Sequence, residues 1–123
     1  MNAAPVFLLV EPSPTLQSVL HKWLQDIFNH PRILIAANGV DALRLAAQEA
    51  PSHVLIEISL PDRMGLEILY ELRQGLPAAR IVATGWSDNS FLLDRIKFTG
   101  ADGYIVKDKL ASGLLPLWKI SIE

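Results

Sequence analysis

Four polar residues lie at the ends of short apolar segments spread over nearly the whole chain. They are Glu11, Glu57, Thr84 and Lys107. If the segments are parallel strands, their carboxyl ends meet at one edge of a sheet, where open α/β folds place their chemistry. Carboxylates hold divalent cations, and a hydroxyl and an ammonium group neutralise phosphoryl oxygens. The four residue types together therefore indicate a site of the phosphoryl-transfer kind.

The stretch around Glu57 indicates how these residues are positioned. Residues 54–58 read VLIEI, an almost continuous apolar run between turn residues. Such a run is typical of a strand that is buried on both faces of a parallel sheet. A carboxylate at the end of that strand is poorly solvated and needs partners. A helical pattern of leucines begins at Gly65.

Short apolar segments alternate with amphipathic helical patterns along the whole chain. The expected strands are Val6–Val10, Arg32–Ala36, 53–58, 80–84 and Gly103–Val106, and the expected helices lie within 14–28, 40–50, 65–74, 91–98 and from 112 onward. This alternation predicts right-handed crossovers and a parallel sheet with helices on both faces. Ser112 is expected to cap the last helix, because Pro116 is tolerated only in the first turn of a helix.

Length and composition exclude several classes of protein. The 123 residues, 1–123, make one domain, and the absence of cysteine excludes disulfides and thiol chemistry. A net charge of −2 with scattered Lys and Arg argues against nucleic-acid binding by this chain alone. No apolar run reaches the length of a membrane helix, so a cytoplasmic domain is expected. The three histidines lack a second ligand at metal spacing, and we expect them to be structural.

Four separated motifs carry a resemblance to the receiver domains of two-component response regulators, over all 123 residues. They are VEPSPTLQSVL, EISLPDRMGLE, IVATGWSD and GADGYIVKD, in the order of the family. The resemblance implies a three-layer, flavodoxin-like (βα)5 fold with a doubly wound parallel sheet in strand order 2-1-3-4-5. It implies that Glu57 stands at the phospho-acceptor position and Glu11 in the acidic site. It further implies phosphoryl-binding or switch roles for Thr84, Tyr104 and Lys107.

The chain departs from the family at positions on which phosphorylation depends directly. Glu57 replaces the phospho-accepting aspartate, and Pro12 replaces the second acid, which in the family is a direct magnesium ligand. Glu57 extends its carboxylate by about 1.5 Å, and a misplacement of roughly 1 Å can slow an aligned reaction about a hundredfold. Only Glu11, Glu57 and a backbone carbonyl near Ser59 remain as metal ligands. We therefore expect no tightly bound cofactor and at most weak magnesium binding.

These departures favour a non-enzymatic, receiver-like signalling module that works without phosphorylation, through protein–protein interaction. The alternative is a phosphorylation-competent receiver that uses Glu57 with weakly held Mg²⁺ and has autophosphatase activity. A small-molecule-binding flavodoxin-like protein is disfavoured, because Pro12 and Pro14 occupy the place of a glycine-rich phosphate loop.

The resemblance implies a histidine kinase, an output protein or an output domain as partner. In the family, the fourth helix, fifth strand and fifth helix form the usual partner surface, here about 90–98, 104–106 and 113–120. The apolar residues of these segments fit a partner face or homodimer face, and equally an ordinary core. Among them are Phe91, Leu92, Leu115 and Trp118.

The longer Glu57 side chain can approach Lys107 and Thr84, where a phosphoryl oxygen would otherwise lie. At about 4 Å and an effective dielectric near 20, a Glu57–Lys107 pair gains roughly 4 kcal/mol before desolvation is subtracted. The pair would fix either an active-like state, with Thr84 and Tyr104 drawn inward, or an inactive-like one. The sequence leaves both open.

The surrounding residues are expected to have plainer roles. Glu11 should be solvated, because its acidic neighbour is absent. A solvated turn is expected at Asp62 and Arg63. Trp86 is a large aromatic residue in a loop, and we expect it to lie over the edge of the sheet, although it could cover the site or contact a partner.

Overall fold

The computed structural model describes residues 4–87 and 89–120 and contains a five-stranded parallel sheet in the order β2-β1-β3-β4-β5. The predicted fold class and strand order are confirmed. The strands are β1 (Val6–Val10), β2 (Arg32–Ala36), β3 (His53–Glu57), β4 (Arg80–Gly85) and β5 (Gly103–Val106). The helices are α1 (Pro14–Ile27), α2 (Gly39–Glu49), α3 (Gly65–Gly75), α4 (Ser90–Thr99), the 3-10 turn η1 (Lys107–Lys109) and α5 (Leu110–Trp118).

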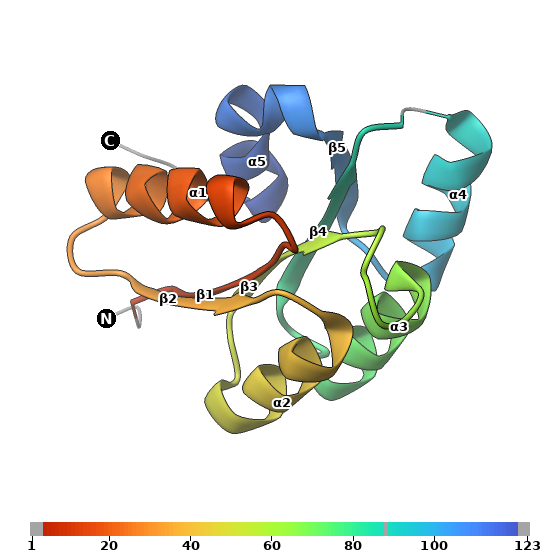
Figure 1. The fold of residues 1–123 in the computed structure, drawn as a ribbon, viewed down its shortest axis with the longest axis horizontal. Coiled ribbons are helices and arrows are strands. Elements are labelled where there is room, and N and C mark those ends of the chain that lie inside the picture. The colour runs from red at the N-terminus through yellow and green to blue at the C-terminus, as the bar shows by residue number, and fades with distance from the viewer. Residues whose placement is uncertain (1–3, 88, 121–123) are drawn as a thin grey trace.

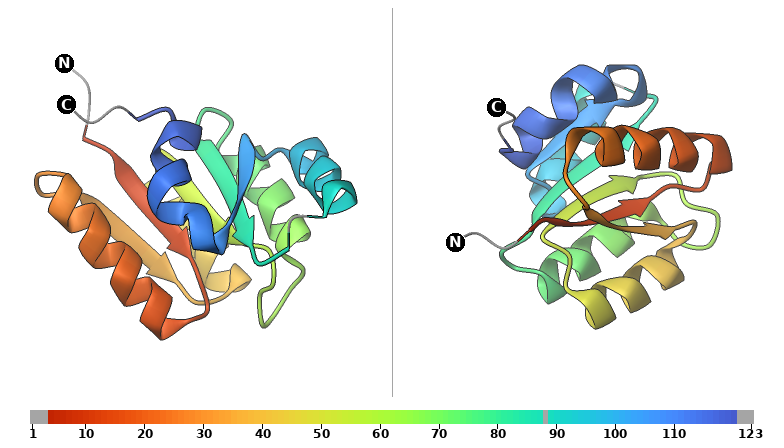
Figure 2. Two further views of the ribbon diagram at one scale, coloured as in Figure 1. Left: turned by 90° about the horizontal axis from the view of Figure 1, so that it is seen from above. Right: turned by 90° about the vertical axis from the view of Figure 1, so that its left-hand side faces the viewer.

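Helices cover both faces of the sheet (Figure 1). Helices α1 and α5 lie on one face and α2 and α3 on the other, as the end-on view in Figure 2 shows. Leu8 and Val10 of β1 belong to the core under α2, α3 and α4, whereas Phe7 and Leu9 belong to the core under α1 and α5. Both faces are therefore apolar, which explains why the central strands have continuous hydrophobic sequences.

Local capping starts the first two helices where the sequence predicts. Ser13 accepts a hydrogen bond from the Leu16 amide at 3.3 Å at the start of α1. The side chain of Asn38 accepts one from the Asp41 amide at 2.8 Å at the start of α2. Each cap satisfies a backbone donor that the first helical turn leaves free. Among the helices of the described residues, none has the length and apolar character needed to cross a bilayer.

The last helix differs from the prediction. It begins at Leu110, directly after η1, so Ser112 and Pro116 both lie inside it and Ser112 is not its cap. The Ser112 hydroxyl instead donates to the Lys109 carbonyl at 3.3 Å. Proline removes one helical hydrogen bond, and the burial of four apolar side chains outweighs that loss. These are Leu110, Leu114, Leu115 and Trp118.

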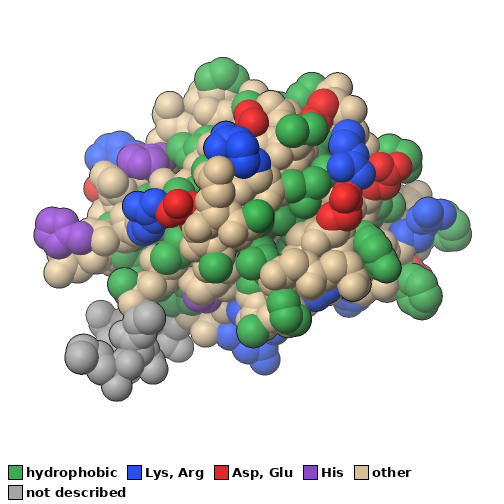
Figure 3. Space-filling view, turned by 90° about the horizontal axis from the view of Figure 1, so that it is seen from below, with side chains coloured by type: hydrophobic (Ala, Val, Ile, Leu, Met, Phe, Trp, Pro, Cys, Tyr) green, Lys and Arg blue, Asp and Glu red, His purple; other side chains and the backbone are tan. Residues whose placement is uncertain are grey.

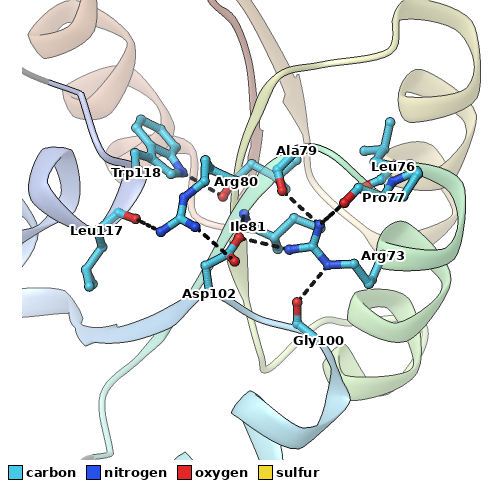
Figure 4. Close-up of polar contacts among 11 residues, drawn as sticks. Arg73, Leu76, Pro77, Ala79, Arg80, Ile81, Gly100, Asp102, Leu117 and Trp118 are labelled. Atoms are coloured by element: carbon cyan, nitrogen blue, oxygen red, sulfur yellow. Dashed lines mark hydrogen bonds and ion pairs between the residues drawn. The ribbon is translucent and has the colours of Figure 1, made fainter.

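The amino-terminal edge of the sheet is held by Asp102, which lies just before β5 (Figure 4). Its carboxylate accepts a hydrogen bond from the Ile81 amide at 2.7 Å and pairs with Arg73 at 2.8 Å and Arg80 at 3.1 Å. Arg73 also donates to the carbonyls of Leu76, Pro77, Ala79 and Gly100. This network joins α3 to β4 and β5 at the end of the strands opposite to the residues predicted to do chemistry.

Asp102→Ala is expected to lower the free energy of unfolding by about 1.5–3 kcal/mol, the typical contribution of hydrogen bonds to charged groups. The substitution also leaves two guanidinium groups without their carboxylate. Urea denaturation at pH 7 measures the change. The matched control is Asp26→Ala, which removes only an exposed pair with Lys22 and should change stability by less than about 1 kcal/mol. Equal midpoints for the two variants would contradict the structural role of Asp102.

Candidate functional site

The carboxyl ends of the strands bring Glu11, Glu57 and Lys107 together. Glu11 follows β1, Glu57 ends β3, and Lys107 follows β5. The Lys107 Nζ lies 2.7 Å from Glu11 Oε1 and 2.5 Å from Glu57 Oε1. The three side chains expose only 3–6% of their surface. They form a buried group of two carboxylates and one ammonium, here called the acid–lysine cluster.

The second oxygen of each carboxylate is bound by the backbone. Glu11 Oε2 accepts a hydrogen bond from the Ser13 amide at 2.9 Å, and Glu57 Oε2 accepts one from the Ser59 amide at 2.9 Å. In both cases the chain turns back over the carboxylate two residues later. Buried charges are tolerated when they are paired and hydrogen-bonded. All four carboxylate oxygens of the cluster have such a partner.

The electrostatic balance of the cluster favours a charged lysine. Burial alone would lower the pKa of Lys107, because it penalises the ammonium form. Hydrogen bonds and charges from Glu11 and Glu57 outweigh the burial and raise the pKa of Lys107 above its ordinary value of 10.5. The ammonium is therefore protonated at neutral pH and stays between the two carboxylates.

The expectation that Glu11 is solvated is wrong. Glu11 exposes only 2% of its surface. The sequence shows that its neighbour Pro12 cannot assist it, but it does not show that Lys107 reaches Glu11 and Glu57 at once. A lysine has three donors, so one ammonium can bond both carboxylates.

Thr84 and Tyr104 both lie near the cluster, and both hydroxyls donate to backbone carbonyls. Thr84 pairs with Glu57 in the sheet register, yet its hydroxyl donates to the Ile105 carbonyl at 2.7 Å. Tyr104 packs against the core under α2, α3 and α4, and its hydroxyl donates to the Ser87 carbonyl in the β4–α4 loop. Tyr104 thus lies inward, whereas the Thr84 hydroxyl is directed to β5.

Trp86 flanks the cluster at the surface. The Lys107 Nζ lies 5.5 Å from the centroid of its ring, within the range of a cation–π contact. The residue is nevertheless 72% exposed. Trp86 therefore contacts the buried ammonium with one part of its ring and presents the rest to solvent, so it is a natural fluorescent reporter of the site.

Contacts of the β3–α3 loop were missed by the sequence analysis. The Asp62 carboxylate accepts hydrogen bonds from the amides of Gly39 at 2.8 Å and Val40 at 3.0 Å, at the start of α2. These hydrogen bonds lower the pKa of Asp62. Arg63 pairs with two acids of α3, Glu67 and Glu71. Asp62 is exposed, as expected of a solvated turn. The sequence analysis did not foresee that the free amides at the start of α2 attract its carboxylate.

The residues predicted as magnesium ligands do not fit a divalent cation as they are arranged. Glu11 and Glu57 each give one oxygen to Lys107 and the other to a backbone amide. Pro12 has no ligand side chain. Within residues 4–87 and 89–120, no three His, Asp or Glu side chains are grouped as a metal site. The ammonium of Lys107 is the cation that these carboxylates bind.

Two of the four apolar residues expected on the partner surface belong to the core. Leu115 and Trp118 are buried, and the Trp118 indole donates to the Val54 carbonyl at 2.9 Å. Leu92 is half-buried, whereas Phe91 is 69% exposed. The exposed apolar surface of these segments is therefore concentrated on α4.

Comparisons with known proteins agree with this architecture. Residues 7–115 match the response regulator receiver domain family. The chain is 36% identical over 76 residues to the transcriptional regulatory protein KdpE of Mycobacterium tuberculosis, covering 62% of this chain and 33% of the relative. It is 29% identical over 108 residues to the nitrate/nitrite response regulator NarL of Escherichia coli, covering 88% and 50%. The chain thus spans between a third and a half of these two curated relatives.

Solved structures show the same fold. The chemotaxis response regulator CheY4 of Vibrio cholerae superposes with a TM-score of 0.83 at 21% identity, over 94% of this chain and 99% of that one. A LuxR-family two-component response regulator from Aurantimonas gives 0.83 at 24% identity, over 93% and 81%. The family match covers most of the chain, and the sheet order and the motif positions agree with it. This chain belongs to the family of response regulator receiver domains.

Proposed function

We propose that this receiver domain signals without being phosphorylated, through contacts with other proteins. Receiver domains of two-component systems interact with histidine kinases and output domains, and either class is a candidate partner here. The observation that carries the proposal is the pairing of Glu57, whose two carboxylate oxygens are bound by Lys107 and the Ser59 amide. A nucleophile needs a free lone pair directed at its target, and this carboxylate directs its oxygens inward.

The charges around Glu57 support the same proposal. In a phosphoryl-transfer site, cations neutralise the charge of the transferred group. Here the ammonium of Lys107 is already shared between Glu57 and Glu11. A phosphoryl group would compete with these carboxylates for the ammonium, and a carboxylate that lost the lysine would stay buried with only its backbone hydrogen bond, which is unfavourable.

The cluster also supplies a way to hold the domain in one conformation. It joins the ends of β1, β3 and β5 through charge-assisted hydrogen bonds, which are stronger than neutral ones. With the cluster formed, Tyr104 lies inward and bonds the Ser87 carbonyl. We infer that the domain keeps this arrangement of the β4–α4 loop without a phosphoryl signal, and presents one fixed surface to its partner.

The alternative is a receiver that is phosphorylated on Glu57 and dephosphorylates itself. It is supported by the presence of both Thr84 and Lys107 at the expected strand ends. It is disfavoured by the Thr84 hydroxyl, which donates to the Ile105 carbonyl rather than toward Glu57. No contact of this chain with nucleic acid is proposed, because blue and red side chains are interspersed on the face in Figure 3 and the net charge is −2.

Incubation with acetyl phosphate and Mg²⁺, followed by intact-mass measurement, separates the two functions. We expect no phosphoryl adduct under conditions that fully modify a receiver domain carrying aspartate at the acceptor position. Titration with Mg²⁺ alone should leave the tryptophan fluorescence of the chain unchanged. An adduct on the native chain that is absent from Glu57→Gln would overturn the proposal and support the alternative.

A further inference from the structure

The last turn of α5 is attached to the amino-terminal edge of the sheet by two neighbouring residues. The Arg80 guanidinium donates to the Leu117 carbonyl at 2.8 Å, as Figure 4 shows. The next residue of α5, Trp118, contacts His53, with 5.6 Å between the centroids of the two rings. His53 and Arg80 are direct partners in the register of β3 and β4. Two consecutive residues of α5 are therefore held by one cross-strand pair.

His53 is packed among aromatic side chains. The centroid of its ring lies 5.6 Å from that of Phe7 and 5.6 Å from that of Trp118, and Phe7 stacks on Trp118 at 5.1 Å. The Nδ1 atom of His53 lies 2.8 Å from the hydroxyl oxygen of Ser52. The side chain is half-buried. This environment favours a neutral imidazole, because an imidazolium would lose part of its hydration.

The nearest charged group to His53 is a cation. Arg80 lies opposite His53 on the adjacent strand. The carboxylate of Asp102 pairs with Arg80 at 3.1 Å, but it also pairs with Arg73 at 2.8 Å. One acid therefore already serves two guanidinium groups. A further positive charge at position 53 would add to an excess of positive charge at this edge of the sheet.

The other elements at this edge provide no acid to His53 within the described part of the chain. Strand β1 and helix α5 contain no charged residue, and Lys119, which follows α5, is a cation. In the last turn of α1, Asp26 pairs with Lys22. Burial first, and then the charge of Arg80, lower the pKa of His53 below its ordinary value of 6.5. The imidazole is therefore neutral at pH 7.

We propose that His53 is a proton-sensitive latch, which holds the last turn of α5 on the sheet when it is neutral and loosens that turn when it is protonated. An imidazolium repels the Arg80 guanidinium, which holds the Leu117 carbonyl. It also gains hydration by moving away from Trp118. One proton therefore weakens both attachments. Histidine changes its charge in mild acid, so the turn is expected to loosen below neutral pH.

This inference goes beyond the proposed function and does not depend on whether Glu57 is phosphorylated. His53 begins β3, whereas Glu57 and the acid–lysine cluster lie at the opposite end of the strands. The tests of the latch involve neither a phosphodonor nor Mg²⁺, so either proposal can fail while the other holds.

Urea denaturation at pH 7 and pH 5 tests the latch. Because the pKa of His53 is lowered by folding, the unfolded chain binds the proton more tightly, and stability is lost as the pH falls from about 6.5 toward the folded-state pKa. His53→Phe keeps an aromatic ring that cannot be protonated. On acidification, the unfolding equilibrium constant of the native chain should rise more than that of the variant, by a factor of up to about 25.

Hydrogen exchange measured by mass spectrometry shows whether the effect is confined to α5. At pH 5, the backbone amides of 110–118 should exchange at least about threefold faster in the native chain than in His53→Phe. At pH 7 the two proteins should agree, because the native imidazole is then neutral. Amides of β1 and α2 should exchange alike in both proteins at both pH values. His53→Gln cannot be protonated either and should show the same insensitivity to acid as His53→Phe.

The matched control is His30→Asn. His30 is exposed and has a positive φ of 52°, which asparagine tolerates, so this variant should keep the native response to acid. The latch is overturned if the native chain and His53→Phe respond equally to acid, or if exchange rises equally over the whole chain. It is also overturned if His53→Phe is the more acid-sensitive protein, as attraction of the imidazolium to the rings of Phe7 and Trp118 would cause.

Discussion

Lys107→Met is expected to lower the free energy of unfolding by about 3–5 kcal/mol at pH 7, the typical effect of removing one partner from a buried ion pair. The methionine is similar in length, so the variant removes the charge with little change in packing. Glu11 and Glu57 would then lie close together, buried and without a cation. Their backbone hydrogen bonds, from the amides of Ser13 and Ser59, remain. The decrease in the free energy of unfolding therefore measures the contribution of the Lys107 ammonium.

The pH dependence of stability distinguishes this cause from a packing defect. The folded-state pKa of Lys107 is raised above 10.5. Its contribution is therefore complete below the unfolded-state pKa and is lost as the pH rises through the folded-state pKa. In Lys107→Met this alkaline loss should disappear.

Urea denaturation between pH 7 and pH 11 measures the loss of stability at pH 7 and its alkaline dependence. The matched control is Lys109→Met, which changes an exposed lysine two residues away and should keep the native profile. The triple variant Glu11→Gln/Glu57→Gln/Lys107→Met should recover most of the lost stability, because it removes all three buried charges together. If Lys107→Met were as stable as the native chain at pH 7, the cluster would not be what holds this edge of the sheet.

The strands could be predicted because the sequence features that mark them lie within each strand and its adjoining turns. In β1, β2 and β5 a run of apolar residues ends at turn residues, and the predicted bounds agree with the structure. The start of α5 was not predictable in the same way. A local rule placed Pro116 in the first turn, whereas the helix begins earlier because Leu110 and Trp118 bury themselves in the core. Tertiary burial outweighs the local preference there.

The sequence predicted which residues form the site, but not which atoms of these residues bind each other. The alternation of strands and helices brings Glu11, Glu57 and Lys107 to one edge, since carboxyl ends of parallel strands meet there. Which oxygen binds which donor depends on side-chain length and loop paths, and no sequence pattern encodes these. The contact of Asp62 with Gly39 was missed for the same reason, because it joins two loops through a helix start.

Close approaches of two backbone segments are a further feature that the sequence did not predict. A Cβ atom on Gly65 would lie 2.2 Å from the carbonyl oxygen of Ile58. Any side chain at this position would therefore force the β3–α3 loop away from the end of β3. The sequence marks Gly65 only as the beginning of a helical pattern, and the reason for a glycine there appears only in three dimensions. This loop also carries the Ser59 amide that binds Glu57.

Pro12→Asp/Glu57→Asp is expected to gain phosphorylation from acetyl phosphate that the native chain lacks. The aspartate at position 57 withdraws the carboxylate by about 1.5 Å. It thereby loosens the contact with Lys107, which is 2.5 Å in the native chain, and frees the ammonium for a phosphoryl oxygen. The aspartate at position 12 restores an acid beside Glu11. Since a misplacement of about 1 Å can cost about a hundredfold in rate, the expected gain is at least of that order.

Each single substitution should have a much smaller effect. Glu57→Asp alone leaves Pro12 without a ligand side chain, and Pro12→Asp alone leaves the Glu57 carboxylate bound by Lys107 and the Ser59 amide. The rate gain of the double variant should therefore exceed the product of the two single gains, as expected for residues that act together. Intact-mass measurement over time in the presence of Mg²⁺ gives the rates. Pro12→Asp/Glu57→Asn is the matched control and should remain unmodified.

A folded double variant that stays unmodified would contradict this explanation of why the native chain is not phosphorylated. The length of the acceptor side chain and the absent second acid would then not be what prevents phosphorylation. The obstacle would instead lie in the hydrogen bond from Thr84 to the Ile105 carbonyl, at 2.7 Å, which directs that hydroxyl away from the acceptor. Modification of the double variant together with its control would instead place the adduct at another residue. Modification of the double variant but not of its control therefore indicates a site disabled by its carboxylates. The absence of modification indicates a site disabled by the conformation of β4.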